Sequence, residues 1–491
     1  MTERAVRVGV VVSVAVTSML VGGCATVGPN YARPDMSPPP AFRDAGEQQP
    51  PESLADTPWW QVFQDEALQA LIRDSIAHNY DLRVAVARVQ EARALARVAR
   101  SFLYPDIGIG VSSSGNQISR NSQPPLVSED DDRVFTNTAI NATMSWELDL
   151  FGRIRRDSEA AFARYLSTEE GRRAVLITVV SDVATAYFQL RELDLQREVA
   201  LRTLALNDQT VDYYRTRLAG GVSNRLELDS AVANRSLTAA SVPDIERQVA
   251  ILENAISVLA GRPPGAVVRG RTLEEQTPPP GIPVGVPATL LERRPDVVEA
   301  EQLLVAANAD IGAAKALFYP RISLTGSVGT VSGDLSDLLK GDSVIWSLGA
   351  GLFQPLFNAG RIRGNYDAAR ARFDQALAEY QQTAISAYRE VSDSLIAIQK
   401  LAAVRAEQQA GVVALRDASQ LSRERYDIGL SSYLEILIAD QQLFERELDL
   451  ARTRGDEMRA LAQLYRALGG GWQPEPPTAP PPTPPTTPTT P

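Results

Sequence analysis

Two stretches of the chain have the hydrophobic pattern of unusually long helices. Residues 153–218 contain no proline and a single glycine, Gly171. A helix of this length extends for about 100 Å. Its apolar side chains recur along one seam with a seven-residue period, which predicts supercoiling against neighbouring helices. The apolar members of this seam, which Arg197 interrupts once, are Leu176, Val183, Leu190, Leu204, Val211 and Leu218.

The second stretch, residues 361–426, repeats the first at a constant offset of 208 positions. From Gly152 and Gly360 onward the register holds without a gap. Each stretch ends at a glycine turn, where glycine provides the left-handed conformation that stops a helix. Return helices are predicted at 226–260 and 434–468. The chain should therefore form two helical hairpins, and apolar residues outside the seam favour a cylinder of helices over one solvated hairpin.

Upstream of each long helix the pattern changes to a period of two, which is typical of strands. Residues 136–150 alternate strictly between an apolar and a polar face. Weaker alternation predicts three further strands, at about 105–113, 321–331 and 344–357. A water-soluble β-sandwich would alternate in the same way. Four strands are too few to close a membrane barrel, whose smallest forms have eight, so closure would require three chains and twelve strands.

The N-terminus has the pattern of a targeting segment. Arg4 and Arg7 precede an apolar run at residues 8–21, which is too short to span a bilayer and fits a secretory signal. The segment Val21-Gly22-Gly23-Cys24 looks like a bacterial lipobox, in which the cysteine is acylated. The alternative is an ordinary signal peptide with a chance cysteine. No later stretch reaches 18 uncharged apolar residues, so we expect any later membrane crossing to use a closed barrel.

Composition excludes several other functions. The net charge of −11 argues against nucleic-acid binding, which needs a basic face. The chain has one cysteine and one histidine, His78, so a disulfide framework or a cysteine- or histidine-rich metal site is not expected. We find no nucleophile–base pairing and no cofactor loop, and we expect neither an enzyme nor a cofactor. Residues 473–491 form a proline-rich tail that is predicted to be disordered.

Several motifs together resemble one family. The order and repetition of these motifs, more than any single one, are similar to the outer-membrane factors, the TolC-like exit ducts of Gram-negative bacteria. The likeness covers about residues 24–472 and is greater to the lipoprotein branch that serves RND-type efflux pumps, the NodT-like set. The segments that carry it are Gly28–Pro34 after Cys24, Trp59–Asp65, Asn79–Leu82, the strand-to-helix junction Trp146–Arg153 and the turn Tyr426–Ile436.

This resemblance implies a fold and a set of partners. The expected fold is mainly α with a small β part: a trimer with a twelve-stranded outer-membrane barrel, four strands per chain, and a periplasmic barrel of long helical hairpins. The implied divisions are a signal peptide at 1–23, a lipidated segment and collar at 24–64, one repeat at 65–288 with a collar loop from 262, a second repeat at 289–472, and the tail.

The implied function is an exit duct in the outer membrane. It passes small molecules from an inner-membrane RND-type transporter and a periplasmic adaptor (membrane fusion protein) to the outside. Two alternatives remain: an exit duct for type I protein secretion, and a structural outer-membrane lipoprotein without a pore. The exported compound is not encoded in the chain, because selectivity in such systems lies in the pump.

Candidate site residues follow from the same resemblance. Cys24 is the lipid anchor, and Trp146, Trp346 and Phe357 are candidates for an aromatic belt at the membrane. The turns that should contact the adaptor, and that also cap helices, are Gly220, Gly221 and Ser223 with Gly429, Leu430 and Ser431.

The pore gate is expected just after the second turn. Leu434 and Ile438 lie four positions apart and share a helix face, so three copies could form an apolar constriction. Ile438 and Gln441 stand where the family often has a gate aspartate and an arginine, which argues against a charged lock. Asp440 as a shifted gate acid is the alternative. Arg425 and Tyr426 are candidates for a latch between neighbouring helices, or else end a solvated seam.

Overall fold

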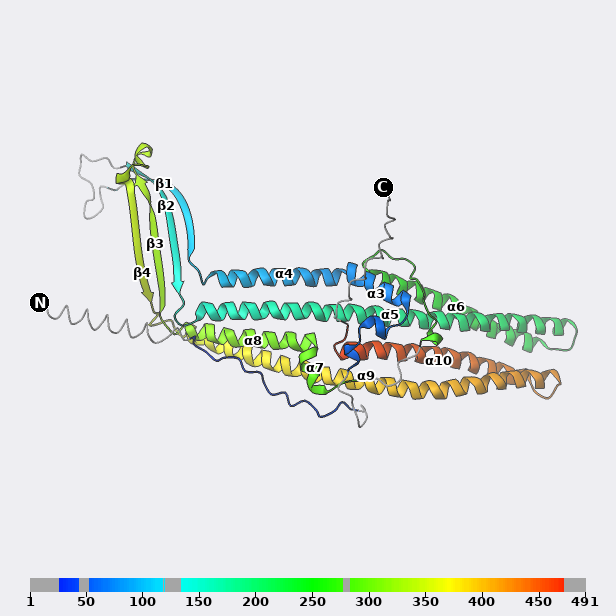
Figure 1. Ribbon diagram of the computed structural model, residues 1–491. Coiled ribbons are helices and arrows are strands. Elements are labelled where there is room, and N and C mark those ends of the chain that lie inside the picture. Colours follow the sequence, from blue (N-terminus) through cyan, green and yellow to red (C-terminus); the bar gives the residue numbers. More distant parts are fainter. Residues whose placement is uncertain (1–25, 44–52, 118, 120–133, 277–282, 472–491) are drawn as a thin grey trace, which may run out of the picture. The chain divides into compact units, whose positions relative to one another are not determined.

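The computed structural model describes residues 26–43, 53–117, 119, 134–276 and 283–471 (Figure 1). The signal segment 1–23, Cys24 and the tail 473–491 lie outside these residues.

Most of the described chain is helical, with one four-stranded sheet. The strands are β1 Asp106–Gln117, β2 Val134–Leu148, β3 Arg321–Ser332 and β4 Val344–Phe353. The helices are α2 Trp59–Val62, α3 Glu66–His78, α4 Tyr80–Ser101, α5 Arg153–Ala219, α6 Arg225–Leu259, α7 Pro287–Arg293, α8 Pro295–Ala316, α9 Arg361–Asp427 and α10 Tyr433–Ala467. Short 3-10 turns lie at η1 Leu54–Asp56, η2 Leu273–Glu275, η3 Leu335–Asp337 and η4 Gly341–Ser343. The predicted fold class, mainly α with a small β part and long duplicated hairpins, is confirmed.

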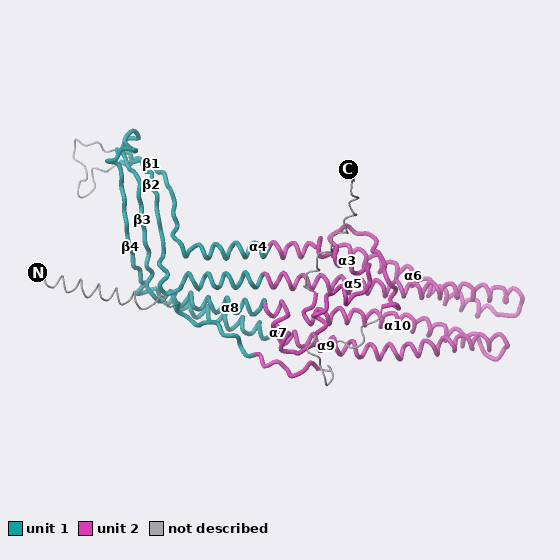
Figure 2. Tube along the Cα trace, viewed as in Figure 1, with its two compact units in different colours: residues 1–35, 88–168, 299–381 teal, residues 36–87, 169–298, 382–491 magenta. Residues whose placement is uncertain are grey.

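The chain divides into two compact units (Figure 2). Unit 1 consists of residues 1–35, 88–168 and 299–381 and contains the sheet with the helix segments that adjoin it. Unit 2 consists of residues 36–87, 169–298 and 382–491 and contains the ends of both hairpins.

The two repeats have equal helix lengths. The long helices α5 and α9 have 67 residues each, and the return helices α6 and α10 have 35 each. The long helices begin where the sequence pattern places them and extend one residue further at the turn. The gap-free sequence register therefore corresponds to matching helix lengths in the two hairpins.

The sheet is antiparallel in the order β1-β2-β3-β4. Its register places apolar residues opposite one another, as in Ile109 opposite Ala142 and Val328 opposite Trp346. The other face carries small and polar residues, such as Thr143 opposite Ser327. The apolar face is exposed: Ile109 is 80% and Trp346 76% accessible. A sheet with one exposed apolar face and one polar face is suited to contact lipid with the first and water with the second.

Some element boundaries differ from the sequence pattern. Strand β1 continues to Gln117, past the predicted end at 113, and β4 ends at Phe353 instead of 357. Pro355 follows β4 and cannot donate to a ladder, and Ala359 and Gly360 then adopt positive φ.

The first repeat begins with two helices, α3 and α4, which are separated at Asn79. The Asn79 side chain accepts a hydrogen bond from the Leu82 backbone N–H at 3.0 Å and so caps the start of α4. Its amide nitrogen donates to the Leu259 carbonyl at 2.9 Å.

By length and composition alone, one helix of the described chain is apolar enough to cross a membrane. It is α5, through an 18-residue window with a mean hydropathy of 1.2, half of which is buried in the chain. The core helix of a soluble bundle meets the same criterion. Val180, Val183 and Leu190 of α5 are at most 1% exposed, so a packing role accounts for this composition.

The N-terminal segment of unit 1 lies against the junction between β2 and α5. The Val27 backbone N–H donates to the Phe151 carbonyl at 3.1 Å. At Gly152, which has φ +81°, a Cβ atom would come within 2.6 Å of Thr26. A side chain at residue 152 would therefore displace the segment.

A buried carboxylate links three segments of unit 2. Asp65 caps α3 by accepting from the Ala67 N–H at 2.9 Å. The same side chain accepts from the Tyr187 hydroxyl at 2.9 Å, the Arg271 N–H at 2.9 Å and the Gln276 amide at 3.0 Å. One acidic side chain thus links α3, α5 and the loop after α6.

Candidate functional site at the ends of the hairpins

The two glycine turns have the same hydrogen-bond geometry. In the first, the Val222 N–H donates to the Arg217 carbonyl at 3.0 Å and the Gly221 N–H to Leu218 at 3.1 Å. In the second, Leu430 donates to Arg425 at 2.8 Å and Gly429 to Tyr426 at 2.9 Å. This is the Schellman arrangement that closes a helix. Gly221 and Gly429 have φ of +71° and +77°.

The caps of the return helices differ between the turns. Asn224 caps α6 by accepting from the Glu227 N–H at 3.0 Å, and the Ser223 hydroxyl donates to the Glu227 carboxylate. At the second turn Ser432 makes no such side-chain bond to α10. The Ser431 hydroxyl donates instead to the Ser422 carbonyl at 3.4 Å, so the second turn is held less tightly at its capping position.

Four helices meet in a tyrosine cluster close to these turns. Tyr214 of α5 is 2% and Tyr433 of α10 6% exposed, and their ring centroids are 4.5 Å apart. Tyr426 of α9 packs edge-on against Tyr214 at 5.8 Å. Ala231 of α6 belongs to the same buried group. The cluster therefore packs the two hairpins together at their free ends.

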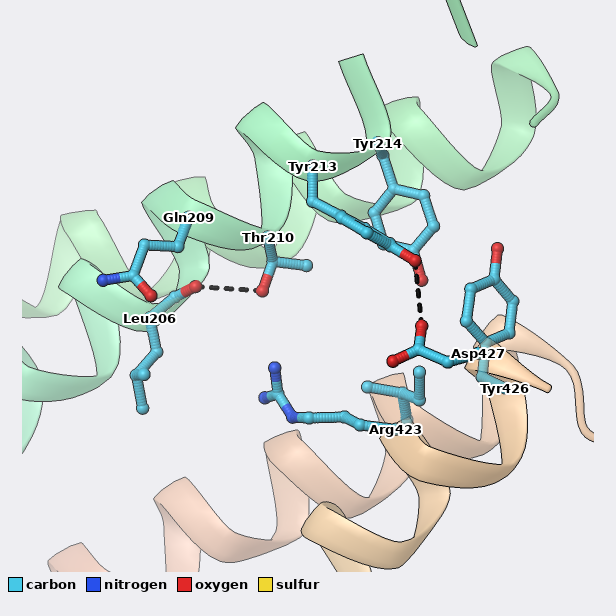
Figure 3. A pocket seen from close by; sticks show the side chains of 9 residues that line it. Leu206, Gln209, Thr210, Tyr213, Tyr214, Arg423, Tyr426 and Asp427 are labelled. Atoms are coloured by element: carbon cyan, nitrogen blue, oxygen red, sulfur yellow. Dashed lines mark hydrogen bonds between the residues drawn. The ribbon is translucent and has the colours of Figure 1, made fainter. Parts of the chain in front are cut away.

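A cavity of about 310 Å³ opens beside this cluster, lined by α5, α9 and α10 (Figure 3). The Tyr213 hydroxyl lies at its edge and donates to the Asp427 carboxylate at 2.9 Å. Arg217 donates to the same phenolic oxygen at 2.6 Å, and its guanidinium lies 5.3 Å from the Tyr426 ring centroid. Tyr213, Arg217, Tyr426 and Asp427 thus form one polar link between the hairpins.

Burial raises the pKa of Tyr214 and of Tyr426, and it raises the pKa of Tyr433 to about 12. The cause is loss of water around the phenolate, which disfavours the charged form. These tyrosines stay protonated at neutral pH and keep their hydroxyl donors. The protonation of the cluster, and with it the packing of the tyrosines, therefore does not change under physiological conditions.

Within the second hairpin, α9 and α10 are joined by a ladder of polar pairs at seven-residue intervals. Arg423 pairs with Asp440 at 2.6 Å, and Arg416 pairs with Glu447 at 2.6 Å. One further heptad along, Arg454 donates to Gln409 at 3.0 Å. Successive pairs recede by seven on α9 and advance by seven on α10, so the ladder fixes the antiparallel register of this hairpin.

The candidate gate residues fall into two groups. Leu434 and Ile438 are 59% and 46% exposed and lie on one outward face of α10. Asp440 is largely buried and accepts from Arg423 and from the Ser419 hydroxyl at 2.5 Å. Gln441 donates to Asn234 of α6 at 3.3 Å. The apolar pair is thus free to face neighbouring molecules, and Asp440 and Gln441 are engaged within their own chain.

The remaining candidate residues either belong to unit 1 or make few contacts at the hairpin turns. Among the described residues, Arg425 donates to the Leu430 carbonyl of its own turn alone, at 3.4 Å. Trp346 and the 90% exposed Phe357 lie in unit 1 with the sheet, as does Trp146, whose indole donates to the Leu103 carbonyl at 3.1 Å. The anchor candidate Cys24 lies outside the described residues.

Sequence reasoning missed Tyr213, Arg217, Arg423 and Tyr433. Some signal was present, since Tyr213 and Arg217 are four positions apart just before a glycine turn and therefore share a helix face. Across the described part of the chain, no three His, Cys, Asp or Glu side chains gather in a way that could hold a metal ion.

Known proteins show the same architecture. The family model for outer membrane efflux proteins matches residues 71–262 and 286–470. The chain belongs to the outer membrane efflux protein family. The cation efflux system protein CusC of Escherichia coli O6:H1 is 35% identical over 93% of this chain and 97% of its own. The probable efflux pump outer membrane protein TtgC of Pseudomonas putida is 34% identical over 94% of this chain and 95% of its own.

Solved structures agree with this assignment. The outer-membrane channel OprN has a TM-score of 0.85 at 31% identity, covering 92% of this chain and all of that one. The MtrE outer-membrane channel of Neisseria gonorrhoeae, in its open state, has a TM-score of 0.83 at 30% identity, covering 91% and 99%. The predicted family and its function as an outer-membrane efflux channel are confirmed. Members of this family are channels and not enzymes, and the NodT-like lipoprotein branch stays a prediction.

Proposed function

We propose that this efflux channel is the homotrimeric exit duct of a tripartite pump. Three chains supply twelve strands to an outer-membrane barrel, and their helical hairpins form a periplasmic duct. The observation that carries this proposal is the sheet, which has one exposed apolar face, one polar face and two unpaired edges, β1 and β4. An open edge exposes backbone donors and acceptors that cannot remain unpaired in a bilayer.

The adaptor is proposed to dock on the two glycine turns. Gly220, Gly221 and Ser223 lie in one turn, and Gly429, Leu430 and Ser431 lie in the other. The common hydrogen-bond geometry of the turns supports a partner that engages both by a similar surface. Leu430 is 67% exposed, so it offers an apolar contact without loss of core packing. An RND-type inner-membrane transporter supplies the substrate and the energy.

The mature chain is proposed to carry a lipid anchor at Cys24. Thr26 lies against Gly152, where the sheet meets α5. The base of an exposed apolar sheet is a suitable place for an acyl chain to enter the outer membrane. Together these points support localisation in the outer membrane by both barrel and anchor.

The closed state is proposed to depend on Leu434 and Ile438. Both side chains are exposed in the single chain, and three copies around a common axis would form an apolar ring. Such a ring resists wetting and blocks ions without charge. Asp440 is less suited to this role, because its carboxylate is already bound by Arg423.

The cargo is proposed to be chosen by the transporter. The relatives include channels named for cation, antibiotic, toluene and solvent efflux, at similar identity to this chain. Because relatives of similar identity are named for such different compounds, we infer that the duct passes whatever its transporter delivers.

Two measurements test the proposal. Purified trimers in a planar bilayer should be mostly closed and open briefly, and Leu434→Ser should make them conduct for longer. A chain that conducts neither as the wild type nor with this substitution would be the structural lipoprotein. Deletion of the gene should raise susceptibility to drugs, dyes or metals and leave protein secretion intact. Loss of a secreted protein with unchanged susceptibility would favour the type I secretion alternative.

A further inference from the structure

The sheet carries its charged side chains on one face. Strands β1 to β4, which the structure describes in full, contain three charged residues: Asp106, Glu147 and Arg321. Residues directly opposite one another in the register share a face, and the register places all three on the polar face, with Thr143 and Ser327. The exposed apolar face has no charged residue. The polar face is therefore the one on which charge can act on a solute in water.

One of the three charges is neutralised locally. The Arg153 guanidinium donates to both carboxylate oxygens of Glu147, each at 3.0 Å. Asp106 and Arg321 are exposed, and neither forms an ion pair with any residue that the structure describes. One negative and one positive charge thus remain available on the polar face of each chain.

These two charges occupy equivalent positions of the two repeats. The segment Tyr104–Ile107 recurs as Tyr319–Ile322, 215 positions later, with Asp106 replaced by Arg321. Each of the two residues begins a strand, β1 after α4 and β3 after α8. The residues opposite them, Ser145 and Phe353, are equivalent as well, at the offset of 208 that relates the long helices. The register therefore repeats, and both charges lie at the end of the sheet that adjoins the helices.

We propose that Asp106 and Arg321 of three copies form a ring of alternating negative and positive charge at the inner mouth of the barrel, and that this balance lets cations and anions pass alike. The inference rests on the proposed trimer, whose barrel turns the polar face of each sheet toward the lumen. Three copies of a duplicated chain supply six equivalent positions. Because Asp106 and Arg321 alternate among them, the ring carries no net charge.

The two charges are too far apart to neutralise each other by direct contact. Strand β2 lies between β1 and β3, which separates them by about 10 Å across the sheet. Through Ser145, Asp106 is level with Thr325, four residues or about 14 Å along β3 from Arg321. Such a stagger is the tilt of strands in a barrel. Each charge therefore acts on passing ions separately, and the balance between them sets the selectivity.

The wall of the sheet supports the longer side chain of the two. The Arg321 guanidinium lies 5.7 Å from the centroid of the Phe353 ring, which is 58% exposed on the same face. This cation–π contact holds the arginine against the wall. Ser145 stands at the equivalent position opposite the short side chain of Asp106. A lipid headgroup is not the partner of Arg321, because its neighbour Ile322 belongs to the apolar face and Arg321 to the opposite one.

Reversal potentials of single channels in a salt gradient test the ring. The recordings use the full chain with Leu434→Ser, which is expected to keep the duct open, and each variant is compared with this background. Arg321→Gln leaves three aspartates and should shift the permeability ratio toward cations. Asp106→Asn leaves three arginines and should shift it toward anions. The matched control Arg321→Lys keeps the charge and should leave the ratio unchanged.

A charge exchange gives a second readout. Asp106→Arg combined with Arg321→Asp restores an alternating ring and should return the permeability ratio to that of the background. Conducting channels whose ratio is the same in Arg321→Gln, Asp106→Asn and the background would overturn this inference and leave the proposed duct standing. Protein that conducts neither with Leu434→Ser nor as the wild type would refute both.

Stability of the trimer distinguishes a structural role. Arg321→Gln and Asp106→Asn should both retain the heat-resistant trimer on semi-native gels, since neither charge has a partner to lose. If both variants lost the trimer and the charge exchange restored it, the two residues would form an ion pair between copies, and the ring would be wrongly assigned.

Discussion

The hydroxyl of Tyr213 donates to the carboxylate of Asp427 and accepts from Arg217, so that one phenolic oxygen links α5 to the end of α9. The bond lies at the surface, beside the buried tyrosine cluster. The two hairpins are thus joined at their ends by an exposed polar contact next to a buried aromatic one.

Removing this hydroxyl should loosen the hairpin ends. Tyr213→Phe keeps the ring beneath Arg217 and leaves Asp427 without its donor, at a cost of about 0.5–1.5 kcal/mol. We expect a higher open probability in single-channel recordings with an unchanged trimer. The matched control, Tyr80→Phe at an exposed tyrosine of α4, should conduct like the wild type. Equal recordings from both variants would show that the bond does not restrain the ends.

The two turns should respond alike to loss of glycine. Gly221→Ala and Gly429→Ala place a Cβ atom at positive φ in otherwise open space, so each should lower the free energy of unfolding by about 1–2 kcal/mol. Gly220→Ala is the control, because residue 220 has no positive φ and only ordinary contacts at 3.6 Å. Thermal denaturation followed by circular dichroism measures the difference. A destabilisation by Gly220→Ala as large as the others would refute the argument from φ.

Leu434 and Ile438 should act as an apolar block. Leu434→Ser and Ile438→Asn add polar groups at exposed positions, so folding should be little affected, and the closed duct should become wet and conduct. Planar-bilayer recordings without adaptor test this. Leu421→Ser on α9, also exposed at 57%, should remain closed. If both gate variants stayed closed, the constriction would have to lie elsewhere.

Asp65 should be among the positions of unit 2 that are most sensitive to substitution. Asp65→Ala removes the acceptor of the Tyr187 hydroxyl, the Gln276 amide and the backbone N–H groups of Ala67, Leu68 and Arg271. We expect a loss of about 3 kcal/mol or more. Tyr187→Phe removes one donor to Asp65 and the acceptor of the Gly270 N–H, and it should cost less, about 1–2 kcal/mol. Guanidinium unfolding of the solubilised protein measures both. Similar small losses in the two variants would contradict the role of Asp65 as a shared acceptor.

Alkaline pH should weaken the tyrosine cluster in a defined window. The folded pKa of Tyr433 is raised to about 12, and the unfolded value is about 10. The unfolded chain therefore loses its proton first, so stability declines as pH rises from about 10 to 12. Denaturation at several pH values should show this decline, and Tyr433→Phe should reduce it. An identical pH dependence in both proteins would exclude Tyr433 as a contributor.

The sequence predicted the elements better than their contacts. The start of α5 at Arg153 and its end near Leu218 follow from the heptad pattern and the glycine turn. Both signals depend only on residues within that segment. The link from Tyr213 to Asp427 depends on how two helices are rotated about their axes, and the heptad repeat leaves that rotation open. The role of Asp440 was ambiguous for the same reason, because its partner Arg423 lies on another helix.

The equal lengths of the paired helices place a restriction on how this chain can change. A deletion of one heptad from α5 would leave its turn about 10 Å short of the turn that follows α9, and Tyr213 would no longer meet Asp427. The same deletion would be tolerated only if α6, α9 and α10 lost a heptad too. We therefore expect changes in duct length to alter α5, α6, α9 and α10 by the same number of residues. Shortened or lengthened ducts can be engineered by the same rule.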